Sequence, residues 1–187
     1  MINSFGSTAI AGYSAGMRIE SLSIVPMLAM GNAMSTFTAQ NMGAGKIDRV
    51  KKGYRMCYVI VLTAGAVLCV MYQLAGGAFV SLFLDSGSSE AYSVGLSYVK
   101  FLSFFYSFIG LKASTDGLLR GAGDVTAFTV ANLVNLAIRV SVTNLFAPIY
   151  GIQVAWMAVP LGWAANYVIS FGWYLTGKWK KIRVIKK

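Results

Sequence analysis

Four charged side chains lie inside long apolar stretches of the sequence: Arg18, Glu20, Lys100 and Arg139. A charge within an apolar segment that spans a membrane is costly, so it normally faces a water-filled cavity or a partner group. Arg18 and Glu20 lie either in such a cavity or at the outer interface of the membrane. For Lys100 we favour a structural role, because its long stem can carry the ammonium group away from the apolar surroundings.

A polar stripe includes the last of these charges. It consists of Asn132, Asn135, Arg139 and Thr143, which are spaced by three and four residues and so share one face of a helix. In lipid that face must meet water, a substrate or another helix. We favour a cavity wall over a helix–helix contact. The candidate residues for a substrate or ion cavity are therefore Arg18, Glu20, Asn132, Asn135 and Arg139.

Several kinds of chemistry are excluded by residue type. The sequence has no histidine and only two cysteines, which removes histidine-based metal sites and the Ser-His and Cys-His pairs of nucleophilic catalysis. Two glycine-rich turns, Asn41–Asp48 and Leu119–Val125, lack residues that a phosphate-binding loop requires. We expect no catalytic residue, no metal site and no cofactor, and a protein that is not an enzyme.

The composition indicates a membrane protein. Hydrophobic residues make up 57% of the 187 residues and charged residues 12%, with a mean hydropathy of +0.64. A helix needs about 20 mostly apolar residues to cross a bilayer. Five stretches qualify: residues 8–39, 56–74, 91–111, 125–146 and 152–175. The sequence predicts an all-α, polytopic protein in which residues 1–177 form one helical lobe.

The basic residues gather in alternate connections between these spans. Thirteen of the sixteen lie between the first two spans, near the turn after the third, or in the tail over residues 178–187. By the positive-inside rule these connections and the basic tail are cytoplasmic. The net charge of +10 therefore reflects topology, and we expect the lipid bilayer, not nucleic acid, as the partner.

Five spans with a cytoplasmic C-terminus place Met1 outside the cell. The first residues carry no basic segment and no cleavable apolar segment that would direct them there. We expect an odd number of further helices to precede this chain.

Small residues recur at every fourth position in the first span, at Gly12 and Gly16 and again at Gly31, Ser35 and Ala39. This spacing lets helix backbones approach closely in lipid. In a segment rich in alanine and glycine it also arises by chance.

Four segments resemble the C-terminal half of the multidrug and toxic compound extrusion (MATE) transporters: Arg18–Ser21, Pro26–Gly31, Ser35–Lys46 and Asp116–Asp124. The resemblance extends over nearly the whole chain. It implies twelve helices in two six-helix lobes around a central cavity, with these five spans as helices eight to twelve. It also implies export of organic cations and other amphipathic, drug-like compounds from the cell in exchange for Na⁺ or H⁺.

The resemblance is incomplete where the coupling ion binds. Some members of the family carry an acidic residue in helix ten, whereas the corresponding stretch here, Tyr106–Leu111, has none. We expect the Na⁺ or H⁺ site in an N-terminal lobe that works with this chain, and a local ion pair between Asp116 and Arg120. Two alternatives are a lipid-linked sugar flippase of the same superfamily and a truncated product without transport activity.

Reporter fusions test the orientation. We expect a fusion at Gly87 to report the outside and one after Lys187 to report the cytoplasm, because the basic residues avoid the connection around Gly87. A cytoplasmic signal at Gly87 would show that the number of spans is wrong.

Overall fold

The computed structural model describes residues 6–84, 89–151 and 153–182. Within these ranges the chain forms α1 (Ser7–Gly43), α2 (Ile47–Val80), α3 (Ser89–Ser103), α4 (Tyr106–Gly121), α5 (Val125–Tyr150), α6 (Gln153–Leu175) and the short 3₁₀ helix η2 (Lys178–Lys181). The predicted all-α class is confirmed. Of the predicted basic tail, residues 178–181 form η2, and residues 183–187 lie outside the described residues.

Within the described ranges, four helices are long and apolar enough to cross a membrane: α1, α2, α5 and α6. The pair α3 and α4 passes the same test as one bent span, with an angle of 52° between its halves, and so gives a fifth candidate crossing. The span predicted over residues 91–111 is therefore not one straight helix, and it continues to Gly121.

Hydrogen bonds explain the break between α3 and α4. Gln73 Nε2 on α2 donates to the Lys100 carbonyl at 2.9 Å, and Ser103 Oγ donates to the same carbonyl at 2.7 Å. Side chains that bond to a helix carbonyl can interrupt the regular ladder and kink the helix. Phe105 N then donates to Leu102 O at 2.8 Å, a tighter, 3₁₀-type turn. No proline or glycine lies at the break, so sequence patterns gave no warning of it.

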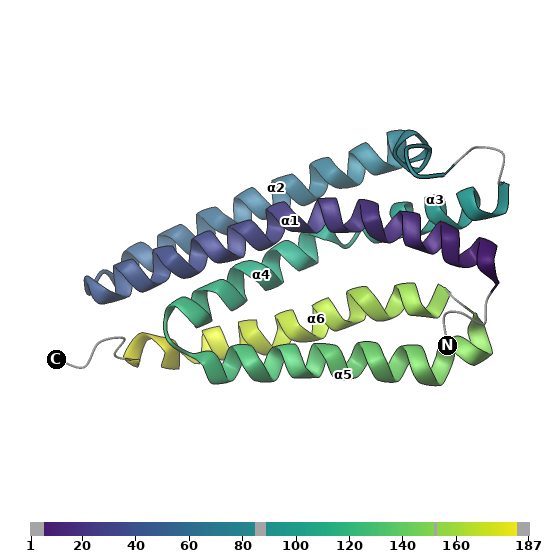
Figure 1. Ribbon diagram of the computed structural model, residues 1–187. Helices are drawn as coiled ribbons and strands as arrows, with labels where there is room; N and C mark the ends of the chain where they lie inside the picture. The colour runs from purple at the N-terminus through teal and green to yellow at the C-terminus, as the bar shows by residue number, and fades with distance from the viewer. Residues whose placement is uncertain (1–5, 85–88, 152, 183–187) are drawn as a thin grey trace.

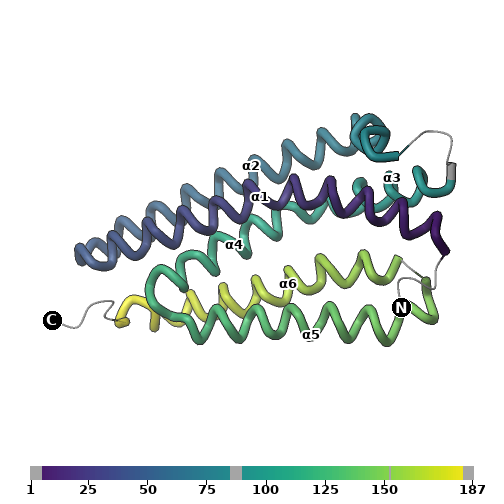
Figure 2. The backbone as a smooth tube through the Cα atoms, viewed as in Figure 1, coloured from purple at the N-terminus to yellow at the C-terminus, as the bar shows by residue number. Residues whose placement is uncertain are grey.

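The helices form two layers joined by α4. Figure 1 shows α1 and α2 side by side in one layer and the α5–α6 hairpin in the other, with α4 crossing between them. The backbone tube in Figure 2 follows the same path. The α1–α2 turn, the α4–α5 turn and η2 gather at one end of the bundle. The described connections that carry the basic residues thus share one end, as the positive-inside rule requires.

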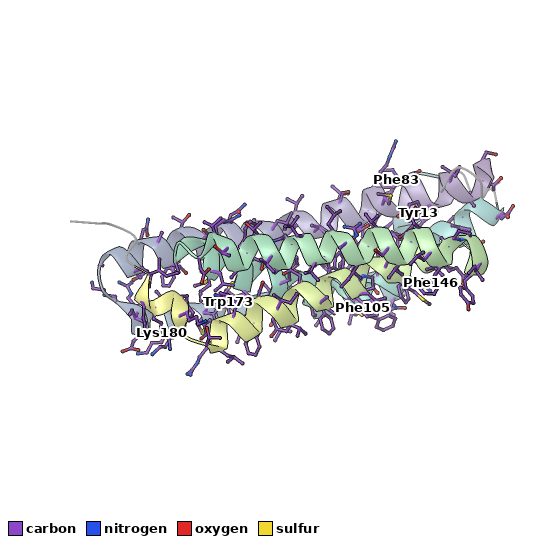
Figure 3. The ribbon with its side chains drawn as sticks, turned by 90° about the horizontal axis from the view of Figure 1, so that it is seen from below. Tyr13, Phe83, Phe105, Phe146, Trp173 and Lys180 are labelled. Atoms are coloured by element: carbon purple, nitrogen blue, oxygen red, sulfur yellow. The ribbon has the colours of Figure 1, made fainter. Side chains whose placement is uncertain are left out.

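Aromatic side chains are found toward both ends. In Figure 3, Trp173 and Lys180 lie toward the end with η2, and Tyr13, Phe83 and Phe146 lie toward the other.

Trp173 Nε1 donates to Asp124 Oδ2 at 2.7 Å, and Asp124 caps α5 by accepting from Ala127 N at 3.3 Å. The α4–α5 turn is therefore tied to the end of α6.

Small residues bring the backbones of α1 and α4 into contact. A Cβ atom added at Gly31 would lie 2.6 Å from the Ala113 carbonyl oxygen. One added at Gly117 would overlap the Gly31 carbonyl, and one at Gly121 would overlap the Ser35 carbonyl. Of the two interpretations that the spacing of Gly31 and Ser35 left open, the structure supports the close approach. Gly12 makes the equivalent approach to the Ala91 carbonyl of α3, whereas Gly16 leaves room for the Tyr98 ring.

A pair of Gly-to-Ala variants tests this contact. We expect Gly117→Ala to lower the free energy of unfolding by about 1–3 kcal/mol, because the added methyl group overlaps α1. Gly172→Ala on α6 is the matched control, since nothing lies within 4 Å of a Cβ there. Thermal unfolding in detergent measures both, and equal stability of the two variants would contradict the close packing of α1 and α4.

Candidate functional site

A buried cluster of polar side chains joins α4, α5 and α6. Lys112 Nζ donates to Asp116 Oδ2 at 3.0 Å and to Asn132 Oδ1 at 3.1 Å. Asn132 Nδ2 donates to Asp116 Oδ2 at 3.4 Å, and Ser170 Oγ donates to Asp116 Oδ1 at 2.6 Å. The Lys112 and Asp116 side chains are only 12% and 6% exposed. The two buried charges therefore neutralise each other, and the Asn132 amide and the Ser170 hydroxyl supply further hydrogen bonds.

The geometry of the cluster follows from helix periodicity. Lys112 and Asp116 are one turn apart on α4, so their side chains lie on the same face. Asn132 Nδ2 also donates to the Phe128 carbonyl at 2.8 Å, which fixes its amide toward α4. Ser170 comes from α6, on which α4 packs.

A cavity of about 300 Å³ opens beside this cluster, and we name it the α1–α4–α5 pocket after the helices that line it. Its lining comprises Leu28, Gly31 and Asn32 of α1, Lys112, Ala113, Asp116, Gly117 and Arg120 of α4, and Phe128 and Asn132 of α5. The pocket thus has a polar wall from α4 and α5 that faces α1.

Arg120 does not pair with Asp116, and that prediction is wrong. Its side chain reaches α1, where Nη2 donates to Asn32 Oδ1 at 2.7 Å and Nε to Ser35 Oγ at 3.4 Å. Its guanidinium carbon lies 5.6 Å from the centre of the Phe128 ring. Asp116 pairs with Lys112 instead. Because α1 approaches α4 so closely at Gly31 and Ser35, Asn32 is within reach of Arg120.

The polar stripe of α5 meets two different surroundings. Asn132 belongs to the polar cluster. Asn135 and Arg139 lie against Gly162 of α6, where an added Cβ would overlap Asn135 Oδ1 and lie 2.9 Å from Arg139 Cγ. Asn135 Oδ1 is buried and has no hydrogen-bond partner within the described part of the chain. That Asn135 and Arg139 line a cavity stays a prediction.

Glu20 lies elsewhere, in the first half of α1, and is buried. It accepts a hydrogen bond from the Tyr98 hydroxyl of α3. The Tyr13 and Trp156 rings pack edge-on against Tyr98, with centroid distances of 5.2 and 5.6 Å. Arg18, two residues before Glu20, is exposed and contributes to neither cluster.

Sequence reasoning missed Lys112 and Ser170. Lys112 counted only as a basic residue near a turn, because the third span was expected to end at Leu111. The i, i+4 spacing of Lys112 and Asp116 was the available signal for a helix that continues to Gly121. Asn166 and Ser170, one turn apart in an otherwise apolar span, were a second signal.

Comparisons with known proteins agree with this architecture. The sequence model of the MatE family matches residues 1–157. The chain is 28% identical over 185 residues to the probable multidrug resistance protein YpnP of Bacillus subtilis, covering 98% of this chain and 41% of that protein. It is 22% identical over 191 residues to the probable multidrug resistance protein NorM of Thermotoga maritima, with 97% and 39% covered.

A crystal structure described as MATE in the bent conformation has the same fold. The TM-score is 0.83 at 17% identity, and the match covers 95% of this chain and 40% of that one. The described helices and these similarities define a multi-pass, α-helical membrane protein. The chain belongs to the MatE family, as its motifs predicted, and it spans about two fifths of the length of the curated relatives that it matches.

A double-mutant cycle tests the buried pair. We expect Lys112→Met and Asp116→Asn each to lower the free energy of unfolding by about 3–5 kcal/mol, because each leaves a buried group without its partner. The double variant should lose less than the sum of the two, since it buries no uncompensated charge. Additive losses, measured by denaturant unfolding in detergent, would show that the two groups do not interact.

Proposed function

We propose that this chain forms the C-terminal lobe of a cation-coupled multidrug efflux antiporter, which exports organic cations or other amphipathic compounds in exchange for Na⁺ or H⁺. The observation that carries this proposal is the match of the MatE family to residues 1–157. The names of the relatives YpnP and NorM support multidrug export.

Two cavities are consistent with the proposal that the substrates are amphipathic. The α1–α4–α5 pocket offers charged and amide groups. A second cavity, of about 290 Å³, is lined only by apolar residues: Phe101, Phe105, Phe108, Met157, Pro160, Leu161 and Ala164. It adjoins the break between α3 and α4. Binding sites for small molecules typically combine apolar walls with a few polar groups that set orientation.

We further propose that the protein lies in the cell membrane with η2 and the basic turns on the cytoplasmic side. The distribution of lysine and arginine supports this orientation. The coupling site is proposed to lie mainly in the N-terminal lobe that works with this one. Within this chain Glu20 is the carboxylate best suited to take part, because Lys112 already compensates Asp116.

A chimera tests export. The matched segment of YpnP is replaced by this chain, and the chimera is expressed in a pump-deficient host with a fluorescent cationic dye. We expect extrusion that stops when the Na⁺ or H⁺ gradient is removed. This chain expressed alone should extrude no dye, because a cavity between two lobes needs both.

Unaltered YpnP and an empty vector are the controls. Extrusion by this chain alone would contradict the need for a second lobe. A chimera that inserts into the membrane but extrudes no dye would contradict multidrug export and favour the flippase or the inactive product.

A further inference from the structure

Arg120 contributes a positive charge to the α1–α4–α5 pocket, and no described carboxylate lies within 4 Å of its guanidinium nitrogens. Its partners are the neutral side chains of Asn32 and Ser35 and the face of the Phe128 ring. Among the described residues, ion pairs shorter than 4 Å join only Lys51 to Asp48 and Lys112 to Asp116. The second cation of the pocket, Lys112, is therefore ion-paired, whereas Arg120 is not.

The contacts of Arg120 orient the guanidinium without neutralising it. Asn32 and Ser35 engage Nη2 and Nε, and the ring of Phe128 supports the planar group. A guanidinium has five N–H donors in a rigid fork that fits the oxygen atoms of a phosphate or carboxylate. Its side chain is exposed to the pocket. Such a group is preorganised for an anion, because little side-chain entropy is lost on binding.

We propose that the α1–α4–α5 pocket binds an anionic group, a phosphate or a carboxylate carried by an amphipathic molecule, with Arg120 as its ion-pairing partner. The molecule is either a transported compound or a phospholipid, since both present the same chemistry. An organic cation is disfavoured here by the net charge of the lining. For a transported compound the inference rests on the proposed function and adds acidic amphipathic molecules to its substrates.

Native mass spectrometry of the full chain released from detergent micelles tests this site. The probes are dodecyl phosphate and its cationic counterpart, dodecyltrimethylammonium. We expect the chain to bind dodecyl phosphate and to bind the cation at least tenfold more weakly. Arg120→Gln should weaken dodecyl phosphate binding by roughly tenfold or more, because a charge-assisted hydrogen bond is lost.

A second variant keeps the test valid if Arg120→Gln does not fold. Asn32→Asp has nearly the same shape and places a carboxylate beside the Arg120 guanidinium. It should also weaken dodecyl phosphate binding by about tenfold, because the new carboxylate then neutralises the Arg120 charge in place of the phosphate. Arg55→Gln is the matched control. It removes one exposed positive charge outside the pocket and should leave binding unchanged.

Competition distinguishes the two sources of the anion. Displacement of dodecyl phosphate by dioctanoyl phosphatidic acid, but not by lauric acid, would assign the site to phospholipid. Displacement by lauric acid would assign it to acidic transported compounds. Unchanged binding in Asn32→Asp, or equal binding of the cationic probe, would overturn the proposal. Because no transport is measured, failure of dye export leaves this result unaffected.

Discussion

The close contact between the backbones of α1 and α4 is the constraint on which the rest of the structure depends. Gly31 and Gly117 leave no room for a side chain between the two helices. In lipid, where apolar residues gain little by leaving the solvent, such packing is a main source of helix association. It fixes α4 so that Asp116 faces α5 and α6 while Arg120 reaches Asn32 of α1.

The bend between α3 and α4 lets this pair of helices pack against both layers. α3 packs along α1, and after the bend α4 crosses toward α6. The bend is stabilised because Gln73 and Ser103 satisfy the Lys100 carbonyl that a straight helix would have used. A free carbonyl in hydrocarbon would cost several kcal/mol. The hydrogen bonds of Gln73 and Ser103 stabilise the bend, and the bend directs α4 so that Asp116 lies between the layers.

The two cations of the α1–α4–α5 pocket show how surroundings divide similar residues into different roles. Lys112 is nearly buried and bonded to Asp116 and Asn132, so its charge holds helices together. Arg120 lies one turn beyond Asp116, is exposed, and has neutral partners. The structural role of Lys112 and the proposed ligand-binding role of Arg120 therefore depend on the groups that neighbouring residues and helices place beside each cation.

The sequence by itself determined the helical class, four of the five crossings, the alternation of basic connections and the family, because hydropathy and charge act locally along the chain. The spacing of Gly31 and Ser35 allowed a close helix contact but was also compatible with chance, and the structure decided in favour of the contact. The tertiary structure decided which polar groups meet. Asp116 could pair with Lys112 or Arg120 by spacing alone, and the choice depends on Asn32 and Ser170, which are distant in sequence. Likewise, Asn132 and Asn135 share a helix face, but only the packing of α4 and α6 separates their surroundings.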